Sequence, residues 1–169
     1  MLWGASGVLD DCFVSDEWYV VFPTDPRWIP NAEREDSARA VFEVLMGDSD
    51  EVEVDRPGRV ALEDAGAGIQ TINCPACGDL VGENPDNMEW WVAQLDRVWT
   101  ESAGFWPLDV TTPCCGAQTS LNDLVYDWPQ GFASWSVRVR NPVYNMTDEQ
   151  LELVGAALGH PVRWAHRHI

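Results

Sequence analysis

Two kinds of hydrophobic spacing alternate along the chain and predict a mixed α/β fold. Trp18–Phe22 is a continuous apolar run that ends at Pro23, which is typical of a buried strand. After Asn31, a suitable helix N-cap, apolar residues recur every three or four positions until Gly47. This spacing predicts an amphipathic helix whose apolar stripe is Ala38, Val41, Phe42 and Leu45.

The middle of the chain predicts a hairpin, a second helix and a short strand. Glu51–Asp55 alternates polar and apolar residues, and Arg56-Pro57-Gly58 separates it from a returning strand at Arg59–Leu62. Asn87–Trp99 repeats apolar residues at helical spacing. Leu108–Thr111 is a short extended run.

The C-terminal part predicts a strand, a helix and another strand. Ala133–Arg140 alternates strictly between apolar and polar residues, as expected for a strand with one buried face. Thr147 and Gln150 match a capping box, and Gly159 is the expected C-terminal residue of the helix that follows. Pro161–His168 is the final predicted strand.

Without the segment that contains most of the cysteines, the predicted order is strand, helix, strand, strand, helix, strand. This is the order of a ferredoxin-like βαββαβ sheet of the α+β class, with the first and third strands central and the helices on one face. We therefore predict an α+β domain from residues 17–69 and 119–169, and an insertion with its own helix at residues 70–118. Residues 1–16 are an N-terminal extension whose lone Cys12 is expected to be a small buried hydrophobe.

Four of the five cysteines lie in two short turns near the ends of this insertion. Zinc prefers four thiolates at tetrahedral corners, and a Cys-x-x-Cys turn aims two sulfurs at one point. We therefore predict a structural zinc site with Cys74, Cys77, Cys114 and Cys115 as ligands. Side chains of adjacent residues diverge in an extended chain, so the fourth ligand is either the second residue of the Cys114–Cys115 pair or a carboxylate or histidine.

Two other chemistries fit a Cys-Pro-x-Cys sequence. Dithiol redox proteins place the first cysteine at a helix N-terminus, but Gly78–Pro85 is a poor helix start. A disulfide is disfavoured because Met1–Val8 lacks the features of a secretion signal. Four thiolates leave no open position for water, so we expect no catalysis at the metal and assign no catalytic residue.

The cysteine turns resemble those of zinc ribbons over residues 72–118, although a ribbon has two residues between the cysteines of its second pair. The whole chain is also similar to a group of uncharacterised bacterial proteins. The shared strings are Cys-Pro-x-Cys-Gly, Pro-Cys-Cys-Gly, Leu-Asn-Asp-Leu and Trp-Pro-x-Gly-Phe-Ala, here at 74–78, 113–116, 121–124 and 128–133. The resemblance implies zinc binding and no particular activity.

Charge restricts the partners that the chain can bind. It has 28 acidic residues against 10 basic ones, all arginine, and a net charge of −18 at pH 7. This charge repels phosphate backbones, so we expect a protein partner, with basic proteins among the candidates, and not nucleic acid. The alternative is that the charge reflects solubility and overall composition alone. No apolar run reaches the roughly 18 residues of a membrane helix, and the predicted location is the cytoplasm.

Two further groups of residues are candidates for binding. Alternation places arginines on one face of two predicted strands, which could form an anion or partner patch on an open sheet face: Arg138, Arg140, Arg163 and Arg167. We prefer cross-strand pairing with acidic residues of the second strand, namely Glu51, Glu53 and Asp55. Polar residues after the second cysteine turn either support the thiolates or form turns and caps: Asn122, Asp123, Tyr126 and Asp127.

The three histidines lie close together in the sequence near the C-terminus. His166 and His168 share one strand face, whereas His160 precedes the strand. The alternatives are a second metal site, a missing ligand of the cysteine site, and solvated surface residues. The expected function is a zinc-stabilised protein that binds another protein; a dithiol redox or zinc-dependent enzyme and a nucleic-acid-binding ribbon are the alternatives. No small-molecule substrate is identifiable.

Overall fold

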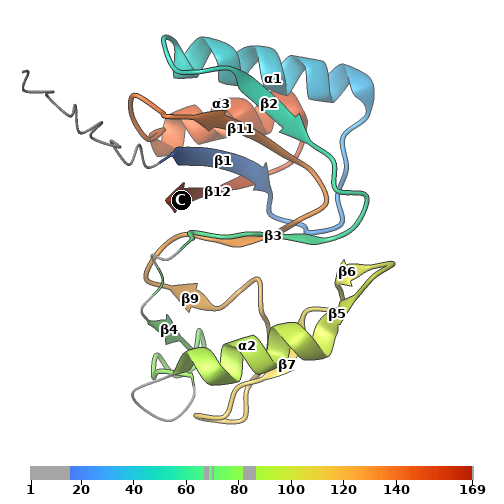
Figure 1. Ribbon diagram of the computed structural model, residues 1–169, viewed down its shortest axis with the longest axis vertical. Coiled ribbons are helices and arrows are strands. Elements are labelled where there is room, and N and C mark those ends of the chain that lie inside the picture. Colours follow the sequence, from blue (N-terminus) through green and yellow to red (C-terminus); the bar gives the residue numbers. More distant parts are fainter. Residues whose placement is uncertain (1–15, 67–68, 70, 82–86, 169) are drawn as a thin grey trace, which may run out of the picture.

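The computed structural model describes residues 16–66, 69, 71–81 and 87–168. Four antiparallel strands form the main sheet in the order β12-β1-β11-β2 (Figure 1). Their bounds are β1 Glu17–Pro23, β2 Val52–Asp55, β11 Ser136–Arg140 and β12 Val162–His168. Helices α1 (Ala32–Met46) and α3 (Asp148–Leu158) pack against each other behind this sheet, and we call these six elements the first body.

Alternating residues of the central strands build the core between the sheet and these helices. Tyr19 lies opposite Val139, and Val21 opposite Val137, and all four side chains are buried. They pack with the apolar stripes of α1 and α3, including Phe42. Intervening residues of β1 are buried as well, on the other sheet face, which explains why this strand is continuously apolar.

The predicted ends of both helices are confirmed. The Asn31 side chain accepts a hydrogen bond from the Arg34 amide at 2.9 Å, so that α1 begins at Ala32. Thr147 forms a complete capping box at the start of α3. Gly159 ends α3 in a left-handed conformation, with φ of 78°.

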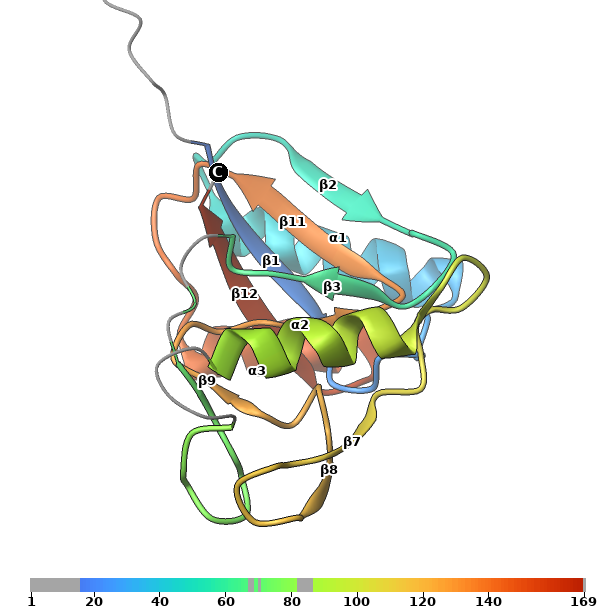
Figure 2. The same ribbon diagram turned by 60° about the horizontal axis from the view of Figure 1, so that its bottom comes forward.

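The remaining described elements form a second body around its own hydrophobic core (Figure 2). They are α2 (Asn87–Val98) and the short strands β3 (Ala61–Glu63), β4 (Ile72–Asn73), β5 (Trp99–Thr100), β6 (Gly104–Phe105), β7 (Asp109–Thr111), β8 (Gln118–Ser120), β9 (Val125–Tyr126) and β10 (Gly131–Ala133). Antiparallel pairs join β3 to β10, β4 to β9, β5 to β6, and β7 to β8. The predicted insertion, residues 70–118, lies in this body. Its core also includes Val60 and Phe132, which are outside the predicted insertion.

The predicted hairpin between β2 and β3 is wrong. β2 pairs with β11 in the main sheet, whereas β3 pairs with β10 in a separate two-stranded sheet. Val60, just before β3, is buried in the second core. Burial of this side chain takes the returning strand away from β2, because the two strands serve different cores.

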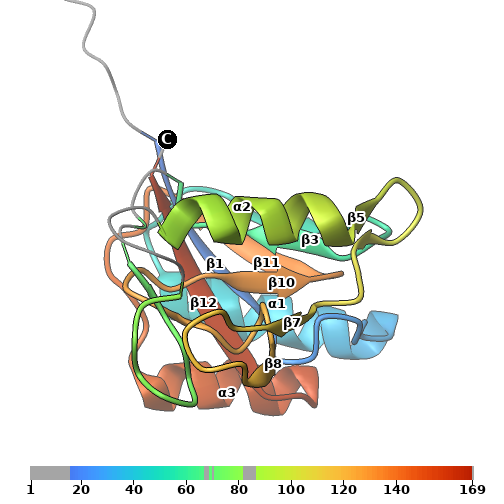
Figure 3. The same ribbon diagram turned by 90° about the horizontal axis from the view of Figure 1, so that it is seen from below.

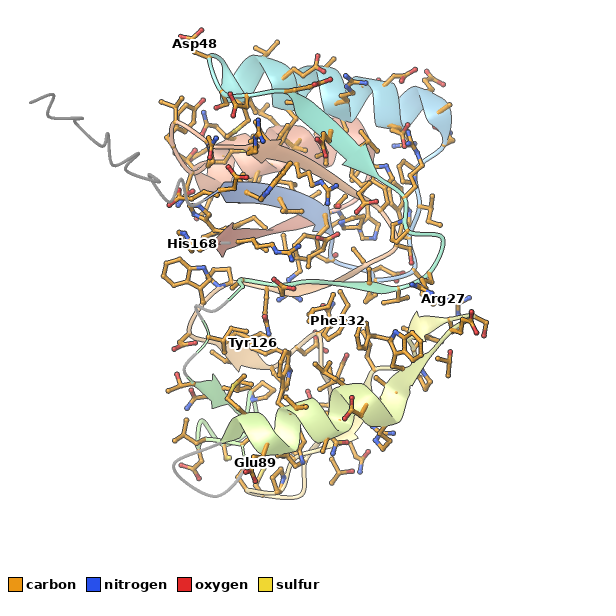
Figure 4. The ribbon with its side chains drawn as sticks, in the orientation of Figure 1. Arg27, Asp48, Glu89, Tyr126, Phe132 and His168 are labelled. Carbon is orange, nitrogen blue, oxygen red and sulfur yellow. The ribbon has the colours of Figure 1, made fainter. Side chains whose placement is uncertain are left out.

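The strand predicted at Ala133–Arg140 is divided between the two bodies. β10 ends at Ala133 and β11 begins at Ser136. The Ser134 hydroxyl donates to the Pro26 carbonyl at 2.9 Å, and Trp135 is buried in the first core. Phe132 points into the second core (Figure 4), so one continuous apolar pattern spans two separate strands.

The second body covers part of the sheet face opposite α1 and α3. Figure 2 shows β3 crossing in front of β1 and β11. Phe22 and Ala165 from the main sheet pack with Ala133. Contact is so close at Gly131 that an added Cβ would lie 2.8 Å from the Phe22 ring. The sheet face that the sequence predicted to be open is therefore partly covered. The predicted N-terminal extension, residues 1–16 with Cys12, lies outside the described residues except for Asp16.

Candidate metal centre

The two cysteine turns have the same backbone geometry. In the first, the Gly78 amide donates to the Cys74 carbonyl at 2.9 Å. In the second, the Gly116 amide donates to the Thr112 carbonyl at 2.8 Å. Both glycines have positive φ, 79° and 73°, which favours glycine at this position. Cys74-Pro-Ala-Cys-Gly therefore aligns position by position with Thr112-Pro-Cys-Cys-Gly.

This equivalence explains how adjacent cysteines both reach one site. Thr112 occupies the position of Cys74, and Cys115 occupies the position of Cys77. Cys114 takes the intermediate position, and its Sγ lies 3.5 Å from that of Cys77. The expectation that the side chains of Cys114 and Cys115 diverge assumed an extended chain, whereas the structure has a tight turn.

The four sulfurs form a compact cluster at one end of the second body, where the two turns lie side by side (Figure 3). The Sγ atoms of Cys74 and Cys115 are 3.7 Å apart, and all four lie within 4.8 Å of one another. Zn–S bonds of about 2.3 Å in a tetrahedron give S–S edges of about 3.8 Å. The cluster therefore has the dimensions of a site for a single thiolate-bound metal ion.

Hydrogen bonds around Cys74 favour its thiolate form. Thr112 is fully buried, and its hydroxyl lies 3.5 Å from the sulfurs of both Cys74 and Cys115. The Thr112 hydroxyl, followed by the Cys77 and Ala76 amides, lowers the pKa of Cys74 to about 6. A bound metal ion would find one sulfur readily deprotonated.

Cys77 shows the opposite behaviour. The Asp79 amide is the largest influence and lowers its pKa, but desolvation and the neighbouring thiols together raise the pKa to about 12. When no cation is present, the crowding of four sulfur atoms therefore favours protonated thiols in the cluster. Metal binding must release these protons, which couples affinity to pH.

The surroundings of the first turn differ from those of a dithiol redox centre. Residues 75–77 form a turn that leads to a bridge between Asn73 and Leu80, and the next helix, α2, begins at Asn87. Cys74 is buried and packs in the second core, while the other three cysteines are exposed. The helix N-terminus that activates a redox cysteine is not found at either turn, in the part of the chain that the structure describes.

The polar residues after the second turn tie the chain together away from the sulfurs. Asn122 donates to the Thr24 carbonyl at 3.1 Å and accepts from the Phe132 amide at 3.0 Å. Tyr126 donates to the Leu121 carbonyl at 2.6 Å, and its side chain points toward α2 (Figure 4). Of the two roles considered from the sequence, these contacts match the turn and cap role.

The four arginines of the possible partner patch have separate acceptors. Arg138 lies 3.2 Å from both Glu53 and Asp55 on the neighbouring strand, which is the cross-strand pairing that we preferred. Arg163 donates to the carbonyls of Asn122 and Gln130, and burial lowers its pKa. The other two pair with acidic residues: Arg140 with Asp16 and Asp50, and Arg167 with Asp64.

Sequence reasoning did not identify two polar groups. Thr112 was missed as a partner of the thiolates, although its alignment with Cys74 in the two turns is a usable signal. Glu17, which lies beside His166 and His168, was also missed because it is distant in the sequence. His166 and His168 form their own cluster with Glu17 and are not ligands in the cysteine cluster. His160 instead packs its ring 4.8 Å from Trp28.

Comparisons with protein-family models, curated proteins and solved structures gave no significant match to the chain. Function is therefore inferred from the residues of the chain itself. Among the described residues, no helix combines the length and apolar character needed to cross a bilayer.

Proposed function

We propose that the protein is a zinc-binding protein in which Cys74, Cys77, Cys114 and Cys115 hold one structural zinc ion. The observation that carries this proposal is the convergence of four sulfurs within 4.8 Å from two matching turns. Thiolates favour zinc over hard cations such as magnesium. Four protein ligands fill a tetrahedron, so the ion would stabilise the fold without an open position for substrate.

The position of the cluster supports a stabilising role. Cys77 and Cys114 are 37 residues apart, and α2 lies between them. Cys74 is buried in the core that the elements of the second body share. A metal bound here would close this long loop and contribute its binding energy to folding. We propose that residues 70–118 are a zinc-binding, ribbon-like insertion in a ferredoxin-like body, a proposal supported by the strand order β12-β1-β11-β2.

We further propose that the protein acts by binding a basic protein. The net charge of −18 supports this partner class. Helix α3 carries three acidic and no basic residues, and α1 carries four acidic and two basic residues. Apolar Val44 on α1 and Leu153 on α3 are 80% and 55% exposed. This helical face thus combines negative charge with apolar contact area. The use of cysteines for a metal favours a reducing location, the cytoplasm.

Zinc analysis combined with thiol titration tests the metal site. We expect one tightly held zinc per chain in this site, and protection of its four cysteines from a thiol reagent until a chelator is added. A metal-free protein in which two of these cysteines cycle between dithiol and disulfide would refute the structural site and support the redox alternative.

Binding of poly-arginine, measured by calorimetry at low and high salt, tests the partner class. We expect salt-sensitive binding that weakens when Asp148, Glu149 and Glu152 on α3 are replaced by their amides. Equal binding by the wild type and this variant would refute α3 as the binding surface. Tight binding to DNA at moderate salt would refute the choice of a basic partner.

A further inference from the structure

A second group of metal-ligating side chains lies on the main sheet, apart from the cysteines. Glu17 at the start of β1 is the register partner of His168 near the end of β12. His166 lies two residues earlier on β12, so its side chain is on the same face as that of His168. The two imidazole rings stack with their centroids 4.6 Å apart. Figure 4 shows His168 at the end of this strand.

The two histidine–carboxylate separations are close to those between ligands of one metal ion. His166 Nε2 lies 3.4 Å from one Glu17 oxygen, and His168 Nδ1 lies 3.2 Å from the other. Zinc bonds of about 2.0–2.1 Å to nitrogen and oxygen place tetrahedral ligands about 3.3 Å apart. One atom from each of the three residues lies within 4.8 Å of the other two.

The surroundings of His166 leave one of its ring nitrogens without a hydrogen bond. The side chain is only 13% exposed, and Nε2 is buried with no hydrogen-bond partner among the described residues. Its contact with Glu17 at 3.4 Å does not have hydrogen-bond geometry. A buried polar atom without a partner costs free energy, so a bound cation at this position would satisfy it.

Aromatic side chains pack beside both histidine rings. Trp128 donates its indole N–H to the His166 carbonyl at 2.7 Å, and its ring lies 5.3 Å from that of His168. Tyr19 meets His166 edge-on at 6.2 Å.

We propose that Glu17, His166 and His168 form a second site that binds a divalent transition metal of the zinc class. Two histidines and one carboxylate supply three ligands, and a partly exposed His168 and Glu17, at 39% and 40%, leave the remaining position accessible to water. This site differs from the cysteine cluster, whose four ligands leave no such position. The ion would therefore exchange more readily and could accept a small external ligand.

The alternative is a pair of histidine–carboxylate contacts that hold the strand ends together. Both arrangements stabilise the sheet, so a loss of stability on mutation does not distinguish them. Metal stoichiometry does, because ion pairs bind no metal.

Titration of the full-length protein with cobalt(II) tests the proposal. The protein is first loaded with one equivalent of zinc and is then titrated with cobalt(II) while absorbance and heat are recorded. We expect a second equivalent to bind with a spectrum that lacks thiolate-to-cobalt charge-transfer bands. His168→Ala and Glu17→Gln should each weaken this second equivalent by more than about 100-fold. The control variant His160→Ala, which removes a histidine outside the cluster, should bind the second equivalent as the wild type does.

Two results would overturn the proposal. One is a wild type that binds no second equivalent; the other is a second equivalent that persists with wild-type affinity in either His168→Ala or Glu17→Gln. Thermal melting before cobalt addition verifies that each variant is folded, and Glu17→Gln retains the shape of the side chain. A wild type that does not retain the first equivalent, the zinc loaded before the titration, would instead refute the cysteine site. The two proposals therefore fail separately.

Discussion

Replacement of Thr112 by valine would separate the support of the thiolates from the ligands themselves. Valine has nearly the shape of threonine and keeps the buried methyl contacts, while it removes the hydroxyl. That hydroxyl lies 3.5 Å from the sulfurs of Cys74 and Cys115 and is fully buried. The substitution leaves all four cysteines in place, so any change in metal affinity reports on this oxygen.

The expected magnitude follows from the geometry. A hydroxyl has one proton, so it stabilises one thiolate at a time, and its contact with the Ala117 carbonyl at 3.4 Å competes. A hydrogen bond to a charged group contributes about 1.5–3 kcal/mol, and the long distance of 3.5 Å places this bond at the low end of that range. A loss of about 1.4 kcal/mol in binding free energy corresponds to a tenfold larger dissociation constant for zinc.

Competition with a chromophoric chelator measures this affinity. We expect Thr112→Val to bind zinc about tenfold more weakly than the wild type. The matched control is Thr111→Val, one residue earlier, whose hydroxyl accepts from Gln118 at 2.7 Å and does not contact a sulfur. Equal zinc affinity for Thr112→Val and the wild type would refute the role of the hydroxyl. A similar loss of zinc affinity in Thr111→Val would mean that the effect comes from a disturbed strand β7 and not from the Thr112 hydroxyl.

Three other predictions concern the fold. Cys74→Ser, or removal of zinc by a chelator, should lower the unfolding free energy by several kcal/mol in thermal melts; an unchanged melt would contradict the stabilising role. Gly131→Ala should cost about 1–3 kcal/mol in urea denaturation because its Cβ would meet the Phe22 ring; wild-type stability would contradict a tight contact at this position. Burial raises the pKa of Glu63, so the folded state holds its proton more tightly than the unfolded state. Stability should therefore fall as the pH rises through the folded pKa, and Glu63→Gln should remove this fall; parallel pH profiles would contradict it.

Local signals in the sequence were sufficient for the helices and for most of the main sheet, although they merged the end of β10 and the whole of β11 into one strand. The Asn31 and Thr147 side chains cap their helices by accepting hydrogen bonds from backbone amides three residues later, so the local sequence alone reveals both caps. The pairing of β3 was not predictable in this way. Two segments of alternating polar and apolar residues joined by a turn look the same in sequence whether or not the two strands pair. The burial of Val60 beside distant residues decides that β3 does not pair with β2.

The members of the cysteine cluster were predictable from residue type and spacing, and their arrangement only in part. Proline and glycine occupy the same positions in both turns, and this match was the available evidence that Cys114 and Cys115 share one turn. The Glu17 cluster was beyond local reasoning. Its formation depends on the pairing of β1 with β12, which brings together residues near opposite ends of the chain.

The two candidate metal sites differ in their relation to the two bodies. The cysteine cluster lies within the second body and is supplied by that body alone. The Glu17 cluster lies on the main sheet where the bodies meet, because Gly66 forms a bridge to His168 and Trp128 donates to His166. An ion at the cysteines would stabilise one core, whereas an ion held by Glu17 and the two histidines would act on the contact between both. The second site, with its open position and its place at this junction, is therefore the better candidate for a ligand-dependent change.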